Sequence, residues 1–230
     1  VKQLLEGGQA VKTIVRNPDK IPEEIKSNPN FELVPSPMDS LSDTELQKAV
    51  EDVAAVVQCL GHTMDFKGMY GAPRDLCEST ARRVCNALAA NKPDTPKKFI
   101  LMNTVGVAAP EDPAGQRTFG DKMILATVRT LIPPHIDNER AAAYLRAPET
   151  AELQPFVEWC IVRPDSLIDA EVTPYEVVPS PVTTIANGRP TTRSNVAAFM
   201  RALVIDNDLW QQWRSKSPVI MNEVAKPESA

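Results

Sequence analysis

The sequence predicts an α/β protein: a doubly wound parallel sheet with a small C-terminal lobe, in a single domain over residues 1–230. Nearly continuous apolar runs such as AVVQCL and KFILMN are typical of strands that are buried on both faces. Segments with helical spacing of apolar residues separate these runs, which predicts right-handed crossovers between parallel strands. From Thr173 onward the chain is richer in proline and turn residues, which indicates the lobe over 173–230.

The composition is that of a soluble globular protein, with 43% hydrophobic and 24% charged residues. A net charge of -5 argues against nucleic-acid binding through a basic surface. No apolar run approaches the roughly 20 residues that span a bilayer. The four cysteines contain no C-x-x-C pair, so we expect buried free thiols in a reducing compartment, either the cytoplasm or an organelle matrix or stroma.

The first third of the chain begins with helical apolar spacing over 1–6, and Gly7-Gly8 predicts the end of that helix. The β-branched run 10–15 predicts a strand. Proline and asparagine make 16–30 a connection with at most a short helix, and 31–37 is a second short strand.

The middle of the chain continues the alternation. A helix is expected over 43–53, with Ser42 or Asp43 as its cap, and a strand over 54–62. A second helix over 76–88 precedes a buried strand over 97–107. Two further helices share 108–146, separated by Pro133-Pro134.

The last third supplies a strand over 157–167 and a helix over 194–203, for which Thr192 or Ser194 is a suitable cap. Trp210 and Trp213 mark either a contact with a protein partner or packing of the C-terminal segment on its own domain. The final KPESA is expected to be a frayed end.

Ligands of doubly wound sheets bind beyond the carboxyl ends of the strands, so the residues that follow each strand are the candidate site. Arg16 follows the first strand, where an arginine suits a 2'-phosphate and an acidic residue suits free ribose hydroxyls. Arg16 therefore favours NADP(H) over NAD(H), the alternative being a solvated arginine at a turn.

Three further strand ends complete the predicted cofactor site. Gly61 would let the main chain approach a dinucleotide closely. Asn103 and Thr104 offer polar groups to a nicotinamide or substrate, although capping of the strand end explains them equally well. The predicted cofactor-binding residues at these ends are Leu60, Gly61, His62, Asn103, Thr104, Val105, Pro164, Asp165 and Ser166.

The ordered set TIVRNPDK, AVVQCLGH, FILMNTVGV, EWCIVRPDSLID and TTRSNVAAFM resembles the atypical short-chain dehydrogenase/reductase superfamily. The resemblance is to its NAD(P)H-binding, NmrA-like and flavin/biliverdin reductase-like branches, and it covers roughly residues 1 to 205. It implies a Rossmann-like sheet whose C-terminal lobe lies on the substrate side, with Tyr175 and Arg189 as candidate substrate contacts.

Members of this superfamily begin with a strand and a G-x-x-G-x-x-G turn that holds the pyrophosphate. Residues 1–6 resemble the end of the helix that follows this turn, whereas the strand and the turn themselves are not among the 230 residues. Because that strand is central in the family order, we expect either about 15 or more residues before Val1 or another chain to fill its place.

The Tyr-x-x-x-Lys pair that classical members use for proton transfer is not found in this sequence. One interpretation is an NADPH-dependent oxidoreductase that passes hydride to a flat acceptor, with solvent, His135, Asp137 or Thr104 as the proton source. The alternative is a non-catalytic dinucleotide-binding regulator or a subunit of a larger assembly. No metal site is expected, because the sequence contains no H-E-x-x-H motif and its two histidines are far apart.

Overall fold

The computed structural model of the protein describes residues 1–34, 36–63, 65–113, 117–153 and 155–223, and the expected frayed end at 226–230 lies outside them. Within these residues the fold is α/β with a mostly parallel central sheet, which confirms the predicted class. No helix in the described part of the chain is long and apolar enough to span a membrane.

The central sheet has five strands in the order β3-β4-β5-β9-β7. Four of these strands, β3, β4, β5 and β9, run parallel to one another, and the edge strand β7 is antiparallel to β9. A separate parallel ladder joins β1 to β2, and a third pairs β6 with β8. The strand bounds are β1 Val11–Ile14, β2 Phe31–Val34, β3 Ala55–Gln58, β4 Lys97–Met102, β5 Val157–Pro164, β6 Leu167–Ile168, β7 Tyr175–Val178, β8 Thr191–Thr192 and β9 Val219–Asn222.

The β1-β2 ladder and the five-stranded sheet share no strand pairing within the described residues. The edges of β1 and β3 therefore lack the neighbour that the family order places between them. As a consequence, Ala55, Val56 and Val57 of β3 are only half-buried, whereas the sequence predicted a strand buried on both faces. The expectation that another segment lies between β1 and β3 stays a prediction.

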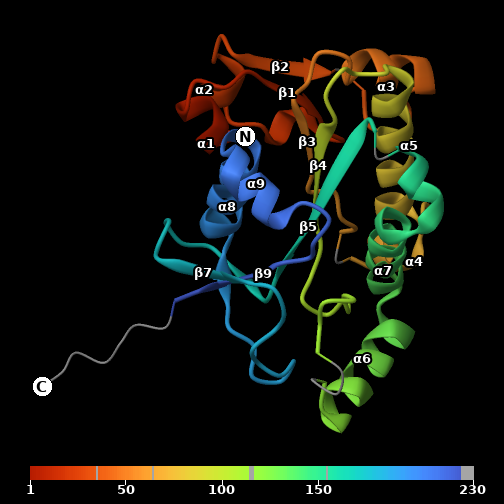
Figure 1. Ribbon diagram of the computed structural model, residues 1–230, viewed down its shortest axis with the longest axis vertical. Coiled ribbons are helices and arrows are strands. Elements are labelled where there is room, and N and C mark those ends of the chain that lie inside the picture. Colours follow the sequence, from red (N-terminus) through yellow and green to blue (C-terminus); the bar gives the residue numbers. More distant parts are fainter. Residues whose placement is uncertain (35, 64, 114–116, 154, 224–230) are drawn as a thin grey trace, which may run out of the picture.

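Helices cover both faces of the sheet, as Figure 1 shows with α5 and α7 on one side and α8 and α9 on the other. The alternation of β4 explains both cores: Phe99 and Leu101 pack against the first pair, and Ile100 packs against the second. All three side chains are at most 1% exposed, which accounts for the apolar run that predicted the strand.

The helices of the first third of the chain begin and end at the capping residues and glycines that the sequence predicts. Helix α1 (Lys2–Glu6) ends at Gly7, and Gly8 adopts a φ of 75°, a conformation that favours glycine. The short helices η1 (Pro18–Lys20) and α2 (Glu23–Lys26) occupy the predicted connection. Helix α3 (Asp43–Ala49) begins with a capping box between Ser42 and Glu45, and α5 spans Leu76–Ala90.

Prolines begin the second of the two middle helices instead of merely separating the pair. Helix α6 (Phe119–Leu131) is followed at once by α7 (Pro133–Arg146), whose first two residues are Pro133 and Pro134. The sequence does not predict helix α4 (Phe66–Tyr70), the 3-10 helix η2 (Pro148–Leu153), α9 (Asn207–Trp213) or the strands β6, β7, β8 and β9.

Both tryptophans of α9 pack on the chain's own sheet. Trp210 and Trp213 are 2% and 6% exposed and lie in the core with α8 (Arg193–Ile205), which Thr192 caps. The self-packing interpretation is thus confirmed, and these residues offer no surface to a partner.

The four cysteines are free, and three of them, Cys77, Cys85 and Cys160, are buried as predicted. Cys59 is exposed, which corrects the prediction for this residue. It follows the last residue of β3, a strand that pairs on one edge only within the described residues, and its sulfur lies 3.9 Å from the Met200 sulfur of α8.

Candidate functional site

Arg16 lies two residues beyond the carboxyl end of β1 and is exposed. It makes no ion pair or side-chain hydrogen bond with any described residue. An arginine side chain carries five N–H donors in a planar fork, and all of them are free to meet an anion here.

The main chain at Gly61 is open. A Cβ atom built on this residue meets nothing within 4 Å, so no neighbouring atom of the described chain restricts the approach of a ligand. Leu60, one residue earlier, turns its carbonyl inward to accept a hydrogen bond from the Cys77 thiol at 3.4 Å. Glycine at 61 is therefore not required by packing in the protein itself.

Asn103 and Thr104 form a turn at the carboxyl end of β4. The Asn103 Oδ1 accepts the Thr104 N–H at 2.8 Å, and the Thr104 Oγ1 accepts the Gly106 N–H at 3.2 Å. The Asn103 side chain also donates to the Asn138 carbonyl of α7 at 2.9 Å. These contacts give both residues the structural role of capping the strand end, and they tie this end to α7.

The main contact at the end of β3 joins His62 to Asp137 of α7. The His62 Nε2 lies 2.7 Å from the Asp137 Oδ2, and the two side chains are 6% and 0% exposed. Both residues are predicted site residues, His62 for the cofactor and Asp137 as a proton source, but 75 positions separate them and no local pattern pairs them. Only the packing of α7 on the strand ends brings them together.

Asp137 also accepts hydrogen bonds from the N-terminus of α5. Its Oδ2 accepts the Cys77 N–H at 2.7 Å and its Oδ1 accepts the Glu78 N–H at 3.0 Å. The partial positive charge of a helix N-terminus stabilises a carboxylate in this position. Both oxygens of the buried Asp137 side chain therefore have hydrogen-bond partners within the protein.

Side-chain ligand atoms of His62, Cys77 and Asp137 lie within 4.8 Å of one another, so the prediction of no metal site has to be weighed again. Burial, followed by the charge of Asp137, raises the pKa of the Cys77 thiol, which disfavours the thiolate that a metal requires. A cation would also face the positive end of α5. We therefore interpret the group as a hydrogen-bonded cluster without a metal ion.

His135, the other predicted proton donor, is enclosed. Its Nε2 lies 3.5 Å from a Glu139 oxygen and is a buried atom without a hydrogen-bond partner in the described chain. Its Cε1 lies 3.0 Å from the position of a Cβ at Gly106. Burial lowers the pKa of His135, against the opposite effect of Glu139, so this ring is held towards its neutral form.

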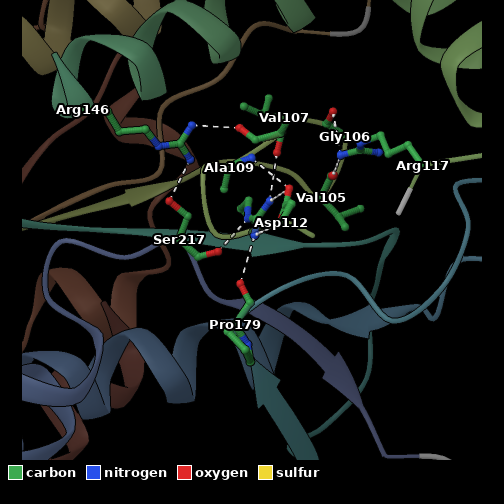
Figure 2. Close-up of polar contacts among 11 residues, drawn as sticks. Val105, Gly106, Val107, Ala109, Asp112, Arg117, Arg146, Pro179 and Ser217 are labelled. Atoms are coloured by element: carbon green, nitrogen blue, oxygen red, sulfur yellow. Dashed lines mark hydrogen bonds and ion pairs between the residues drawn. The ribbon is translucent and has the colours of Figure 1, made fainter. Parts of the chain in front are cut away.

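A buried arginine, Arg163, holds the end of β5 in place, and its partners Asp112, Val107, Pro179 and Ser217 are labelled in Figure 2. Arg163 is 0% exposed, and its guanidinium forms two bonds of 2.8 Å with the Asp112 carboxylate. The remaining donors reach the carbonyls of Ser217 at 2.7 Å, Val107 at 3.1 Å and Pro179 at 3.3 Å. Every N–H of the fork is therefore used within the protein.

Two more arginines hold the loop after β4 (Figure 2). Arg117 donates to the Val105 carbonyl at 2.7 Å. Arg146 donates to the Ala108 carbonyl at 2.8 Å and to the Ser217 hydroxyl at 2.7 Å. Sequence reasoning missed this network, because carbonyl acceptors carry no residue-type signal.

The predicted residues after β5 contact the C-terminal segment. The Pro164 carbonyl accepts the Val105 N–H at 3.0 Å, which joins two predicted site residues. Asp165 accepts the N–H groups of Ser166 at 2.7 Å and Arg189 at 3.1 Å. These contacts fix the loop between β5 and β6 against the segment before β8.

The two predicted substrate contacts are engaged with the chain itself. Arg189 forms an ion pair with Glu176 at 3.1 Å and also donates to the Asn222 carbonyl. Tyr175 pairs with Asn222 across β7 and β9, and burial raises the pKa of its phenol. A role of either residue towards a substrate stays a prediction.

Two surface hollows lie away from the strand ends. The first, of about 330 Å³, is lined by residues of α6, among them Ala126 and Leu131. The second, of about 310 Å³, lies between α1 and α2 and is lined by residues that include Leu5 and Ile25. Neither hollow includes a predicted site residue.

Solved structures of other proteins share this fold. A wide-type short-chain dehydrogenase/reductase from Veillonella parvula, in complex with NADP, matches with a TM-score of 0.68 and 17% identity over 99% of this chain and 91% of that one. An NAD-dependent epimerase/dehydratase candidate from Bacillus halodurans gives 0.64 and 19%, over 96% and 86% of the two chains. A candidate NADH-flavin reductase from Streptococcus pneumoniae gives 0.61 and 14%, over 96% and 91%.

At these identities the structural matches show the fold alone. No curated protein sequence matches the chain. The sequence model of the NAD(P)H-binding family, however, matches residues 1–207, nearly the whole of the described chain. On this match, the protein belongs to the NAD(P)H-binding family.

Proposed function

We propose that the protein is an NADPH-dependent oxidoreductase that reduces a flat acceptor without a Tyr-Lys pair. The observation that carries the proposal is the free guanidinium of Arg16 at the carboxyl end of β1, where it would bind the 2'-phosphate of NADP(H). Charge-assisted bonds to phosphate are about twice as strong as neutral ones, so this single side chain is enough to prefer NADP(H) over NAD(H).

Other residues of the carboxyl edge fit a dinucleotide. The open main chain at Gly61 leaves room for its approach beside Leu60 and His62. Asn103, Thr104 and Val105 follow β4, and Pro164, Asp165 and Ser166 follow β5, and these positions support a role for both sets at the nicotinamide end. The glycine-rich turn for the pyrophosphate is not among residues 1–230, so these residues account for the ribose and nicotinamide ends only.

A bound NADPH supplies the hydride in this proposal, and the chain supplies orientation and a dry environment. The rigid β4 end, held by Asn103 and by the Arg117 contact to Val105, gives the reacting groups a fixed support. The three tyrosines do not reproduce a Tyr-Lys pair. Tyr70 donates to the Leu131 carbonyl at 2.8 Å, Tyr144 is enclosed with its pKa raised by burial to about 12, and Tyr175 lies in β7.

A non-catalytic binding subunit is the second candidate, and the exposed apolar side chains of α6 favour it. Phe119 and Leu131 are 79% and 57% exposed, and Phe66 of α4 is 80% exposed. A hydrogen bond from Tyr70 of α4 to the Leu131 carbonyl joins these two helices, and large apolar surfaces exposed to solvent are typical of protein contacts. A subunit of this kind would bind the dinucleotide tightly and would not turn it over.

Dinucleotide affinity tests the first part of the proposal. Arg16→Ser should weaken NADPH binding about ten- to a hundredfold, by the loss of charge-assisted hydrogen bonds, and leave NADH binding within about twofold. Lys20→Ser is the matched control, because it removes an exposed positive charge four residues later and should change neither affinity. Equal losses for both dinucleotides, or no loss at all, would contradict the role of Arg16.

Turnover separates the two candidate functions. The protein mixed with NADPH and either a flavin or a quinone should show loss of the NADPH absorbance at a rate proportional to protein concentration. Tight binding of NADPH without such loss would favour the binding subunit. Failure of the full-length protein, with the residues expected before Val1 restored, to bind either dinucleotide would contradict both candidates.

A further inference from the structure

We propose that His62 is a catalytic residue that gives a proton to the acceptor through its Nδ1, and that Asp137 is the positioning residue that holds its ring. This inference rests on the proposed oxidoreductase function and names the proton source that the function leaves open. It depends on a geometry that joins the ends of two neighbouring strands.

His62 lies at the ligand-binding edge of the sheet. It lies four residues beyond the last residue of β3, at the edge where ligands of doubly wound sheets bind. Asp137 belongs to the same turn of α7 as Asn138, whose carbonyl accepts the side chain of Asn103 at the end of β4. The dyad therefore lies where the ends of β3 and β4 are bridged by α7.

The second step is the state of the Asp137 carboxylate. It accepts two N–H groups from the N-terminus of α5, a helix of 15 residues, at 2.7 and 3.0 Å. Two such donors and the helix dipole fix the orientation of the carboxylate. One of its oxygens is thereby aimed at the His62 Nε2, 2.7 Å away.

The third step assigns the tautomer. An ionised carboxylate accepts hydrogen bonds and cannot donate them, so Nε2 must carry a hydrogen. Nδ1 then remains the atom at which the ring gains and loses its proton, and it makes no hydrogen bond to any described residue. A carboxylate on one nitrogen that leaves the other for the substrate is the arrangement by which an aspartate orients a histidine base or acid.

The surroundings of the dyad favour a proton carrier over a metal. The described titratable groups that lie beside the ring are Asp137 of α7 and Cys77 of α5. The buried thiol of Cys77 donates to the Leu60 carbonyl and is not poised as a thiolate ligand. His135, which is enclosed behind Gly106, has no comparable carboxylate contact, because its nearest acidic oxygen lies 3.5 Å away.

In the proposed reduction, the acceptor gains two electrons and one hydrogen as hydride from NADPH, which becomes NADP⁺. The reduced acceptor atom takes a proton from Nδ1 of the His62 imidazolium, and the electron pair of the broken N–H bond stays on Nδ1. The neutral ring keeps its Nε2 hydrogen on Asp137 and regains a proton from water.

A measurement without cofactor tests the tautomer. In the ¹⁵N spectrum of the cofactor-free protein, at a pH where the ring is neutral, His62 should show a hydrogen-bearing Nε2 and a bare Nδ1. His135→Gln assigns the signals, since His62 is then the one remaining histidine in the sequence. Asp137→Asn should shift the His62 signals towards the mixture of tautomers of a free imidazole. A hydrogen on Nδ1, or no change in Asp137→Asn, would overturn the dyad.

Turnover tests the proton transfer. His62→Ala should lower the NADPH-dependent rate about a hundredfold or more, the usual contribution of a positioned acid, while NADPH affinity stays within about twofold. Added imidazole should restore part of the rate in His62→Ala and leave the unsubstituted protein unchanged. An unchanged rate in His62→Ala, or no rescue by imidazole, would overturn the catalytic role of His62 and leave the proposed function standing.

Two control outcomes separate this inference from its neighbours. If the unsubstituted protein oxidises no NADPH with any flavin or quinone, the proposed function fails, and the catalytic role fails with it. Removal of metal ions with a chelator should leave the rate unchanged. Loss of the rate on chelation and its return on addition of Zn²⁺ would assign the cluster to a metal and overturn the proton-transfer role.

Discussion

Removal of the Arg163 guanidinium should be among the most destabilising single substitutions in this protein. Arg163 is fully buried, and Arg163→Met leaves the Asp112 carboxylate, only 10% exposed, without its cation. The carbonyls of Ser217, Val107 and Pro179 lose a donor at the same time. Breaking a buried ion pair by removing one partner costs about 3–5 kcal/mol. This is a large part of the roughly 5–15 kcal/mol that stabilises a domain.

Urea unfolding followed by circular dichroism gives the free energy of unfolding that tests this magnitude. Arg193→Met is the matched control, because Arg193 and Asp169 form an ion pair of the same length, 2.8 Å, with side chains that are 55% and 87% exposed. An exposed pair contributes only about 0–1 kcal/mol. The double variant Arg163→Met/Asp112→Leu should be less destabilised than Arg163→Met, because it leaves no unpaired charge. If Arg163→Met is no less stable than Arg193→Met, the reasoning from burial is refuted.

Three further predictions concern local contacts. The Ser42 side chain and main chain hold the pKa of Glu45 below its ordinary 4.5, so this cap stabilises the protein above about pH 4.5 and is lost as the pH falls through the lower folded value. Unfolding midpoints between about pH 6 and pH 3 should therefore fall less steeply in Ser42→Ala, and parallel curves would contradict the cap. Among the cysteines, Cys59 should react first with a thiol reagent in the folded protein and the three buried thiols only after unfolding; rapid reaction of all four in the folded protein would contradict their burial. Trp210→Phe should lower the free energy of unfolding by about 1.5–3 kcal/mol, because the indole donates to the Glu158 carboxylate at 2.7 Å. Trp213→Phe is its control, since the indole nitrogen of Trp213 has no hydrogen bond to a described residue, and an equal loss in both variants would contradict the role of this bond.

Much of the fold could be predicted because its signals are local. The apolar run of β4 indicated a strand buried between two helical layers, and Phe99 and Ile100 confirm this by packing into opposite cores. Helix N-caps could be predicted equally well, because Ser42 and Thr192 cap the helices that follow them. The short helix α4 and the late strand β9 were missed, because each is stabilised by distant partners more than by its own periodicity. The overestimated burial of β3 has the same cause, since it depends on which strand lies beside it.

For the candidate site, the sequence alone determined which residues follow the strands, and the family match over residues 1–207 supports the cofactor class that those residues indicated. Which of these residues contact one another was decided by the tertiary structure only. His62 and Asp137 meet because α7 contacts the ends of β3 and β4, and Arg163 finds its acceptors on three separate loops. Periodicity and turn chemistry act over a few neighbouring residues and are written in the sequence, whereas a hydrogen bond across 75 positions exists only once the packed core has placed both groups.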